Sequence, residues 1–143
     1  VYSNFSHKMG VGGFNKKFKK ENTTEVAWLT QDTNIQREYI KCSMCGQIFP
    51  ANYYHSIASL LLASKKKNNR SRIKRDLEIM ILSGTNDPVG GFGKGPLKLS
   101  KDYLKLGLSV HTKLYENARH ECLNELPEIK DIVYKDILLF IED

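Results

Sequence analysis

The chain has 143 residues, of which 41% are hydrophobic and 27% are charged, with a formal net charge of +6. This length and composition are typical of one globular domain, and no apolar run approaches the ~20 residues of a membrane-spanning helix, so we expect no transmembrane segment. The three cysteines cannot all pair with one another, which argues against a complete disulfide framework and favours a reducing, cytoplasmic location.

The first half of the chain is predicted to be helical. Residues 1–69 show no strand-like alternation, whereas apolar side chains recur at three- and four-residue spacing after Pro50. This spacing places them on one face of a helix, and we expect that face to be buried. Its members are Tyr54, Ile57, Ala58, Leu61 and Leu62.

A Cys-x-x-Cys motif, Cys42 to Cys45, lies in this helical half. A zinc ribbon would need a second pair of ligands, and the sequence contains no second Cys-x-x-Cys and no His-x3–5-His. We therefore interpret Cys42 and Cys45 as ordinary thiols, and we expect no metal site and no cofactor.

The positive charge is concentrated in one segment. Lys65–Arg75 contains seven Lys and Arg residues, which leaves 15 basic against 16 acidic residues in the rest of the chain. A run of like charge is usually a solvated loop, although it could also bind a nucleic acid or an anionic membrane. The run has no aromatic residue on which a base could stack, so we expect no nucleic-acid partner.

Residues 77–143 alternate between strand and helix patterns. An apolar run predicts a strand at Glu78–Ser83, and Lys94–Leu106 predicts a helix with a proline in its first turn and a glycine just past its end. Ser109–Tyr115 alternates as a second strand. A final helix begins near Pro127, and we expect it to turn an apolar face toward a core. That face comprises Ile129, Ile132, Val133, Ile137, Phe140 and Ile141.

Two strands joined through a helix form a βαβ unit with parallel strands, and ligands bind beyond the carboxyl ends of such strands. Asp87 follows the first predicted strand and His120 follows the second. In a Ser-His-Asp site the His takes the proton of the nucleophile, and the Asp orients the His. Asp87 and His120 are therefore the candidate catalytic residues. Taken alone, Asp87 could instead begin a turn, and His120 could be a surface residue.

Other motifs do not fit a functional pattern. The glycine-rich stretch Gly90–Gly95 lacks residues that a phosphate loop and a dinucleotide fingerprint require, so we expect it to let the Asp87 loop approach His120 closely. Cys122 is two residues past His120, and the backbone between them should turn its thiol away from the base. The remaining histidines are interpreted as structural, namely His7, His55 and His111.

The sequence around both candidates resembles a known family. Leu82–Gly90 reads LSGTNDPVG, and Leu114–Glu125 reads LYENARHECLNE. These stretches are similar to the C-terminal end of α/β-hydrolases of the monoglyceride-lipase and lysophospholipase-like branch. A looser similarity to the cap region of bacterial members runs through residues 13–18, 27–32 and 45–50.

The resemblance implies both a fold class and an activity. The fold would be α/β, the C-terminal part of an α/β-hydrolase, with residues 1–76 as a helical cap or lid region with a basic loop and residues 77–143 as a parallel βαβα part. The activity would be that of a serine hydrolase that cleaves carboxylic esters of the monoacylglycerol or lysophospholipid type. His120 would be the general base and Asp87 its orienting carboxylate.

The nucleophile of such an enzyme would lie outside this chain. In α/β-hydrolases the Ser precedes the Asp and the His, in a Gly-x-Ser-x-Gly turn, and the chain contains no such turn. The partners implied are therefore an ester or lipid substrate and the missing N-terminal half of the same enzyme. Two other functions stay open: a non-catalytic fragment or interaction module, whose exposed strand edge could form a homodimer, and an anionic-polymer binder that uses Lys65–Arg75.

Overall fold

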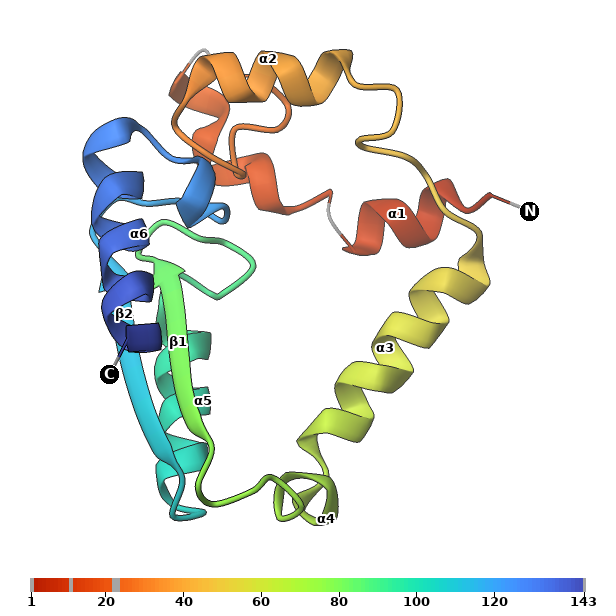
Figure 1. Ribbon diagram of the computed structural model, residues 1–143. Helices are drawn as coiled ribbons and strands as arrows, with labels where there is room; N and C mark the ends of the chain where they lie inside the picture. Colours follow the sequence, from red (N-terminus) through yellow and green to blue (C-terminus); the bar gives the residue numbers. More distant parts are fainter. Residues whose placement is uncertain (1, 11, 22–23, 143) are drawn as a thin grey trace.

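The computed structural model describes residues 2–10, 12–21 and 24–142. Helices form the first half of the chain, and a two-stranded sheet with two long helices forms the second (Figure 1). The elements, in chain order, are α1 (Asn4–Gly10), η1 (Phe14–Glu21), α2 (Thr33–Lys41), α3 (Ala51–Lys65), α4 (Lys67–Arg70), β1 (Glu78–Gly84), α5 (Lys94–Leu104), β2 (Ser109–Tyr115), η2 (Cys122–Asn124) and α6 (Pro127–Glu142).

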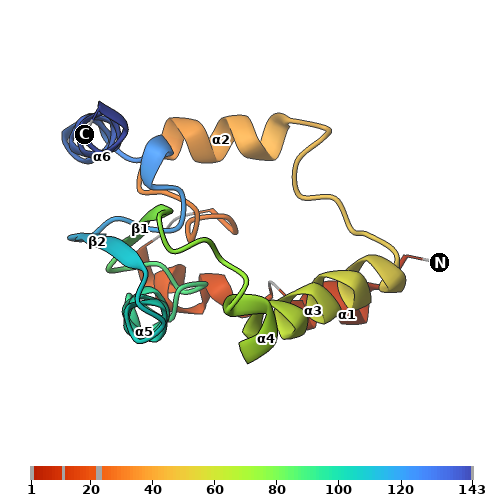
Figure 2. The same cartoon turned by 60° about the horizontal axis from the view of Figure 1, so that its bottom comes forward.

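The predicted βαβ unit is confirmed. Strands β1 and β2 are parallel, in a register that runs from Glu78 opposite Ser109 to Gly84 opposite Tyr115. Helix α5 connects them, and Figure 2 shows α5 and α6 on opposite faces of the sheet. Helix α5 is two residues shorter than predicted, because the chain leaves the helix after Leu104 and turns into β2 through Gly107, whose φ is +77°.

A small core lies where α6 meets the carboxyl end of β2. Tyr115, Ala118, Cys122 and Val133 are buried there. Leu82, Ile129 and Ile137 pack against this cluster. The predicted apolar face of α6 is only partly confirmed, since Ile132 and Ile141 are exposed.

The expectation that the apolar face of α3 is buried is wrong. Helix α3 packs against α1 and α4, and it extends away from the sheet in Figure 1. Ile57, Leu61 and Leu62 are all exposed, as is Leu60 beside them. Periodicity identified the helix correctly, but no element of the described ranges covers these exposed leucine and isoleucine side chains. None of the described helices is long and apolar enough to cross a membrane.

Candidate active site

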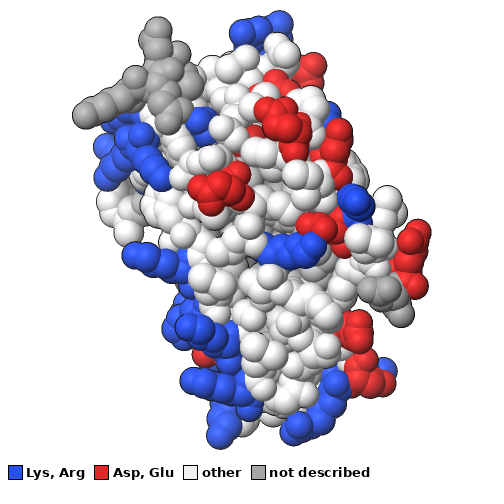
Figure 3. All heavy atoms as spheres, turned by 90° about the vertical axis from the view of Figure 1, so that its left-hand side faces the viewer, with Lys and Arg blue, Asp and Glu red and all other residues white. Residues whose placement is uncertain are grey.

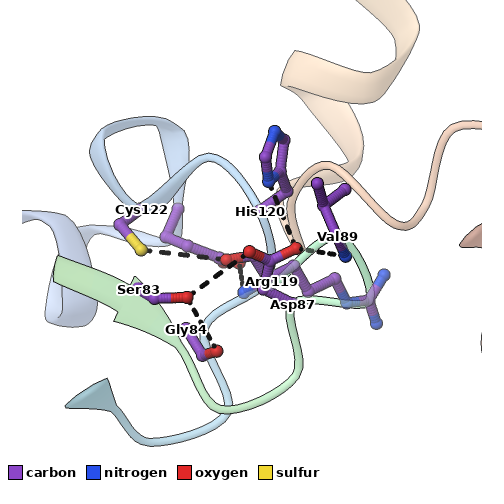
Figure 4. A network of polar contacts seen from close by, with 8 residues as sticks. Ser83, Gly84, Asp87, Val89, Arg119, His120 and Cys122 are labelled. Atoms are coloured by element: carbon purple, nitrogen blue, oxygen red, sulfur yellow. Dashed lines mark hydrogen bonds and ion pairs between the residues drawn. The ribbon is translucent and has the colours of Figure 1, made fainter. Parts of the chain in front are cut away.

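Asp87 and His120 meet at the carboxyl ends of the two strands. Asp87 lies three residues after β1, and His120 lies five residues after β2. The predicted contact is present: Nδ1 of His120 is 3.1 Å from Oδ1 of Asp87 (Figure 4). The Asp87 side chain is 7% exposed and that of His120 is 37% exposed, so the acid is buried behind a base that solvent can reach.

The carboxylate of Asp87 is fixed by its own loop. Its Oδ1 accepts the backbone N–H of Val89 at 2.8 Å, and the hydroxyl of Ser83 lies 3.4 Å from its Oδ2. A side chain at Gly90 would place a Cβ 2.9 Å from Oδ2 of Asp87. Glycine at residue 90 therefore lets the loop fold this tightly around the carboxylate.

The geometry determines which nitrogen of His120 can accept a proton. An ionised carboxylate can only accept hydrogen bonds, so Nδ1 of the neutral imidazole carries the proton and Nε2 is the acceptor. In Figure 4 the ring points away from the strand end, with its Nδ1 edge toward Asp87. The remaining nitrogen is thus free to take a proton from a group outside the described residues, as in a Ser-His-Asp site.

The pKa values of the pair shift in opposite directions. The hydrogen bond that His120 donates to Asp87 raises the pKa of His120, against the effect of burial. Burial by itself raises the pKa of Asp87, but the hydrogen bond and charge of His120, together with the N–H groups of Val89 and Gly90, outweigh it and lower that pKa. Each partner therefore stabilises the charged form of the other.

The N-terminal half supplies one wall of the site. The His120 ring packs against Trp28 with a centroid distance of 5.4 Å, and Trp28 packs against Phe14 at 5.2 Å. The backbone N–H groups of His120 and Glu121 donate to the carbonyls of Trp28 and Leu29, at 3.3 and 2.8 Å. Trp28 also lines a cavity of about 550 Å³ with Tyr39, Ile40 and Cys45.

Glu125 connects the His120 loop to the N-terminal half of the chain, a role that the sequence analysis did not predict. It is 1% exposed, its Oε1 accepts the N–H of Arg119 at 2.7 Å, and its Oε2 accepts the backbone N–H of Gln31 at 3.1 Å. The buried guanidinium of Arg119 donates to the carbonyl of Ala27 at 2.7 Å and stacks on Phe18. The sequence feature that could have pointed to this role is the Asn124-Glu125 pair, which ends the motif around His120.

Gly84 makes a second close approach that the sequence did not reveal. A Cβ on Gly84 would lie 2.0 Å from the carbonyl oxygen of Ala118. The N–H of Asn86 donates to that same carbonyl at 2.9 Å. The loops that carry Asp87 and His120 are therefore in direct backbone contact.

The other residues that the sequence pointed to take no part in the Asp87–His120 contact. The thiol of Cys122 is buried and directed at the carbonyl of Arg119, 3.7 Å away, and burial raises its pKa to about 11. His111 is exposed on β2, and Nδ1 of His7 is 3.1 Å from the hydroxyl of Tyr54. Within the described ranges no group of three His, Cys, Asp or Glu residues could hold a metal ion.

The basic segment Lys65–Arg75 is remote from this site. It lies at the opposite end of the sheet, before β1, where Arg70 pairs with Asp102 of α5 at 3.1 Å (Figure 1). Figure 3 shows Lys and Arg side chains gathered along one edge of the face that it displays, with most of the Asp and Glu side chains elsewhere on that face.

Comparison with known proteins identifies the fold. No protein family profile matches this sequence, and no curated protein is significantly similar to it. The chain superposes on a highly thermostable carboxyl esterase from Bacillus coagulans with a TM-score of 0.82 and 23% identity, over 94% of this chain and 44% of the esterase. It superposes on a lipase in an open form with a TM-score of 0.80 and 21% identity, over 92% of this chain and 42% of the lipase.

The chain thus spans less than half the length of these two structures. It has the α/β-hydrolase fold in part, as a parallel βαβα unit preceded by a helical region.

Proposed function

We propose that this chain is the C-terminal part of a serine hydrolase that cleaves carboxylic esters, with a substrate of the monoacylglycerol or lysophospholipid type. The observation that carries the proposal is the 3.1 Å contact between Asp87 and His120 at the carboxyl ends of two parallel strands. A carboxyl esterase and a lipase, each of which contains this part of the fold, support the hydrolase class.

In this proposal His120 is the general base. Its Nε2 takes the proton of a serine hydroxyl contributed from outside this chain, as that oxygen attacks the ester carbonyl. The imidazolium that forms is stabilised by Asp87 and then gives its proton to the leaving alcohol, which releases an acyl-serine. Water, deprotonated by the same imidazole, hydrolyses this intermediate. The stabilising groups for the oxyanion would likewise come from the remaining part of the fold.

Residues 1–76 are proposed to be the cap over this site. Their contribution to the wall beside His120, through Trp28 and Phe14, supports this role. The cavity of about 550 Å³ that Trp28 lines is large enough to receive part of the acyl chain or the alcohol group of an ester substrate.

The remaining part of the α/β-hydrolase fold is the proposed main partner. The exposed apolar side chains of α3 and α6 support it, because surfaces of this kind are association sites. A homodimer through the same surfaces is the alternative partner. We also propose a cytoplasmic location, which the odd number of cysteines supports.

Labelling with a fluorophosphonate probe tests the proposal. The chain, extended to include the remainder of the fold, should react at one serine, because the probe modifies serines that a base activates. His120→Ala should abolish labelling, whereas His111→Ala, which removes an exposed histidine on β2, the strand that precedes the His120 loop, should not. Equal labelling of wild type and His120→Ala would contradict the assignment.

A further inference from the structure

Cys42 and Cys45 lie at the two ends of a tight turn that follows α2. The N–H of Cys42 donates to the carbonyl of Glu38 at 3.0 Å, which ends the helix, and the N–H of Cys45 donates to the carbonyl of Cys42 at 3.1 Å. The second bond closes a four-residue turn, whose first and last Cα atoms are within about 7 Å. A disulfide bridges Cα atoms about 4.4–6.8 Å apart, so the backbone brings the two thiols within bonding reach.

The turn is held in this shape by neighbouring groups. The N–H of Gly46 donates to the hydroxyl of Tyr39 at 3.1 Å, and Gly46 has a φ of +65°, which glycine adopts without strain. Tyr39 belongs to α2, so the end of the turn is tied back to the helix that precedes it. The positions of Cys42 and Cys45 are therefore fixed relative to each other.

The two thiols are free and accessible. Cys42 is exposed and Cys45 is half-buried. They border a hollow of about 430 Å³ together with Glu38 and Glu121. A small reagent can reach the pair, and the pair adjoins the His120 loop because Glu121 is the next residue along.

We infer that Cys42 and Cys45 form a redox-active dithiol that reacts with small-molecule disulfides, such as glutathione disulfide, and closes to an intramolecular Cys42–Cys45 disulfide. In the first step the Cys42 thiolate attacks one sulfur of glutathione disulfide, which forms a mixed disulfide and releases one glutathione thiolate. In the second step the Cys45 thiolate displaces the second glutathione. The pair loses two electrons and two protons, and glutathione disulfide is reduced to two molecules of glutathione.

The surroundings of the thiols assign these two roles. The backbone N–H of Met44 and the thiol of Cys45 lower the pKa of Cys42, whereas the contact with Cys42 raises that of Cys45. The thiolate is the attacking species, so Cys42 is the first nucleophile and Cys45 the resolving thiol. Cys122 is a natural internal control, because burial keeps its thiol protonated and closed to reagents.

Incubation of the folded chain with glutathione disulfide tests the inference. After an acid quench, denaturation and alkylation of the remaining thiols, trypsin releases residues 42–65 and 120–130 as separate peptides. We expect peptide 42–65 to carry no alkyl group and to be lighter than its reduced form by two hydrogen atoms, while Cys122 in the other peptide stays fully alkylated. Dithiothreitol should reverse the change.

Two exposed-site variants separate the steps. Cys45→Ser should accumulate a stable glutathione adduct on Cys42, and Cys42→Ser should react more slowly than wild type and form no intramolecular disulfide, since it has lost the thiol whose pKa the N–H of Met44 lowers. Ser43→Ala, which keeps both thiols, should close the disulfide as wild type does, and circular dichroism would confirm that each variant is folded. Peptide 42–65 that is unmodified, or that retains glutathione in the wild type, would overturn the inference.

Discussion

The hydrogen bonds of Asp87 predict how Asp87→Asn behaves. Its Oδ1 accepts from both His120 Nδ1 and the N–H of Val89, whereas Oδ2 faces the hydroxyl of Ser83. An asparagine satisfies these groups in one orientation only, with its oxygen toward the imidazole and its NH₂ toward Ser83, whose oxygen can accept. The substitution should therefore keep the imidazole in place and remove the negative charge alone.

The charge sets the size of the effect. At the observed 3.1 Å, the attraction between a carboxylate and an imidazolium is about 5 kcal/mol at an effective dielectric constant of about 20. The imidazole is 37% exposed, so solvent screens part of this attraction. If between half and all of it remains, kcat should fall by about 10²- to 10⁴-fold, since each ~1.4 kcal/mol is tenfold in rate. Asp87→Ala, which also removes the orienting acceptor, should fall at least as far.

Steady-state hydrolysis of a short p-nitrophenyl ester measures this effect, in the chain extended to include the remainder of the fold. Asp131→Asn is the matched control, because it removes an equal charge from an exposed position on α6. A kcat for Asp87→Asn close to that of Asp131→Asn and of wild type would refute the reasoning, because the carboxylate would then have no part in stabilising the imidazolium.

Three further predictions concern the chain as it stands. In an NMR titration the pKa of His120 should lie above its ordinary value of 6.5, and it should fall in Asp87→Asn. Because the folded pKa is raised, protonated His120 stabilises the folded state fully at pH values below 6.5, and this stabilisation is lost as pH rises through the folded pKa. Glu125→Gln should destabilise the fold by about 1–3 kcal/mol in denaturant unfolding at fixed protein concentration, because both carboxylate oxygens of Glu125 accept N–H groups and the NH₂ of glutamine would have to face one of these donors. Glu128→Gln, at an exposed position of α6, should have little effect. Sedimentation should show a dimer, an aggregate or a complex with the missing part of the fold, since Leu60 is 67% and Leu62 is 65% exposed; a compact monomer at all concentrations would mean that these surfaces need no partner.

The βαβ unit and the placement of Asp87 and His120 could be predicted because their signals are local. The apolar run of β1, the alternation of β2 and the glycines around α5 each report on a few neighbouring residues. Parallel pairing then follows from the connection alone, and it brings the two strand ends together.

The support of the site could not be predicted in the same way. Glu125 is buried because it meets Gln31 and the N–H of Arg119, and the contact with Gln31 spans 94 positions of the sequence. The amphipathic pattern of α3 was equally misleading about burial. Periodicity shows that a helix has an apolar face, but it does not show whether a partner for that face lies within the chain.

The most direct test of the central claim is ester hydrolysis by the chain together with the remainder of the fold. The rate is compared between wild type, His120→Ala and His111→Ala. The account predicts that His120→Ala loses most activity on a short p-nitrophenyl ester, because the serine has no base, that His111→Ala stays close to wild type, and that the 143-residue chain by itself is inert. Near wild-type hydrolysis by His120→Ala would contradict the assignment of this histidine as the base.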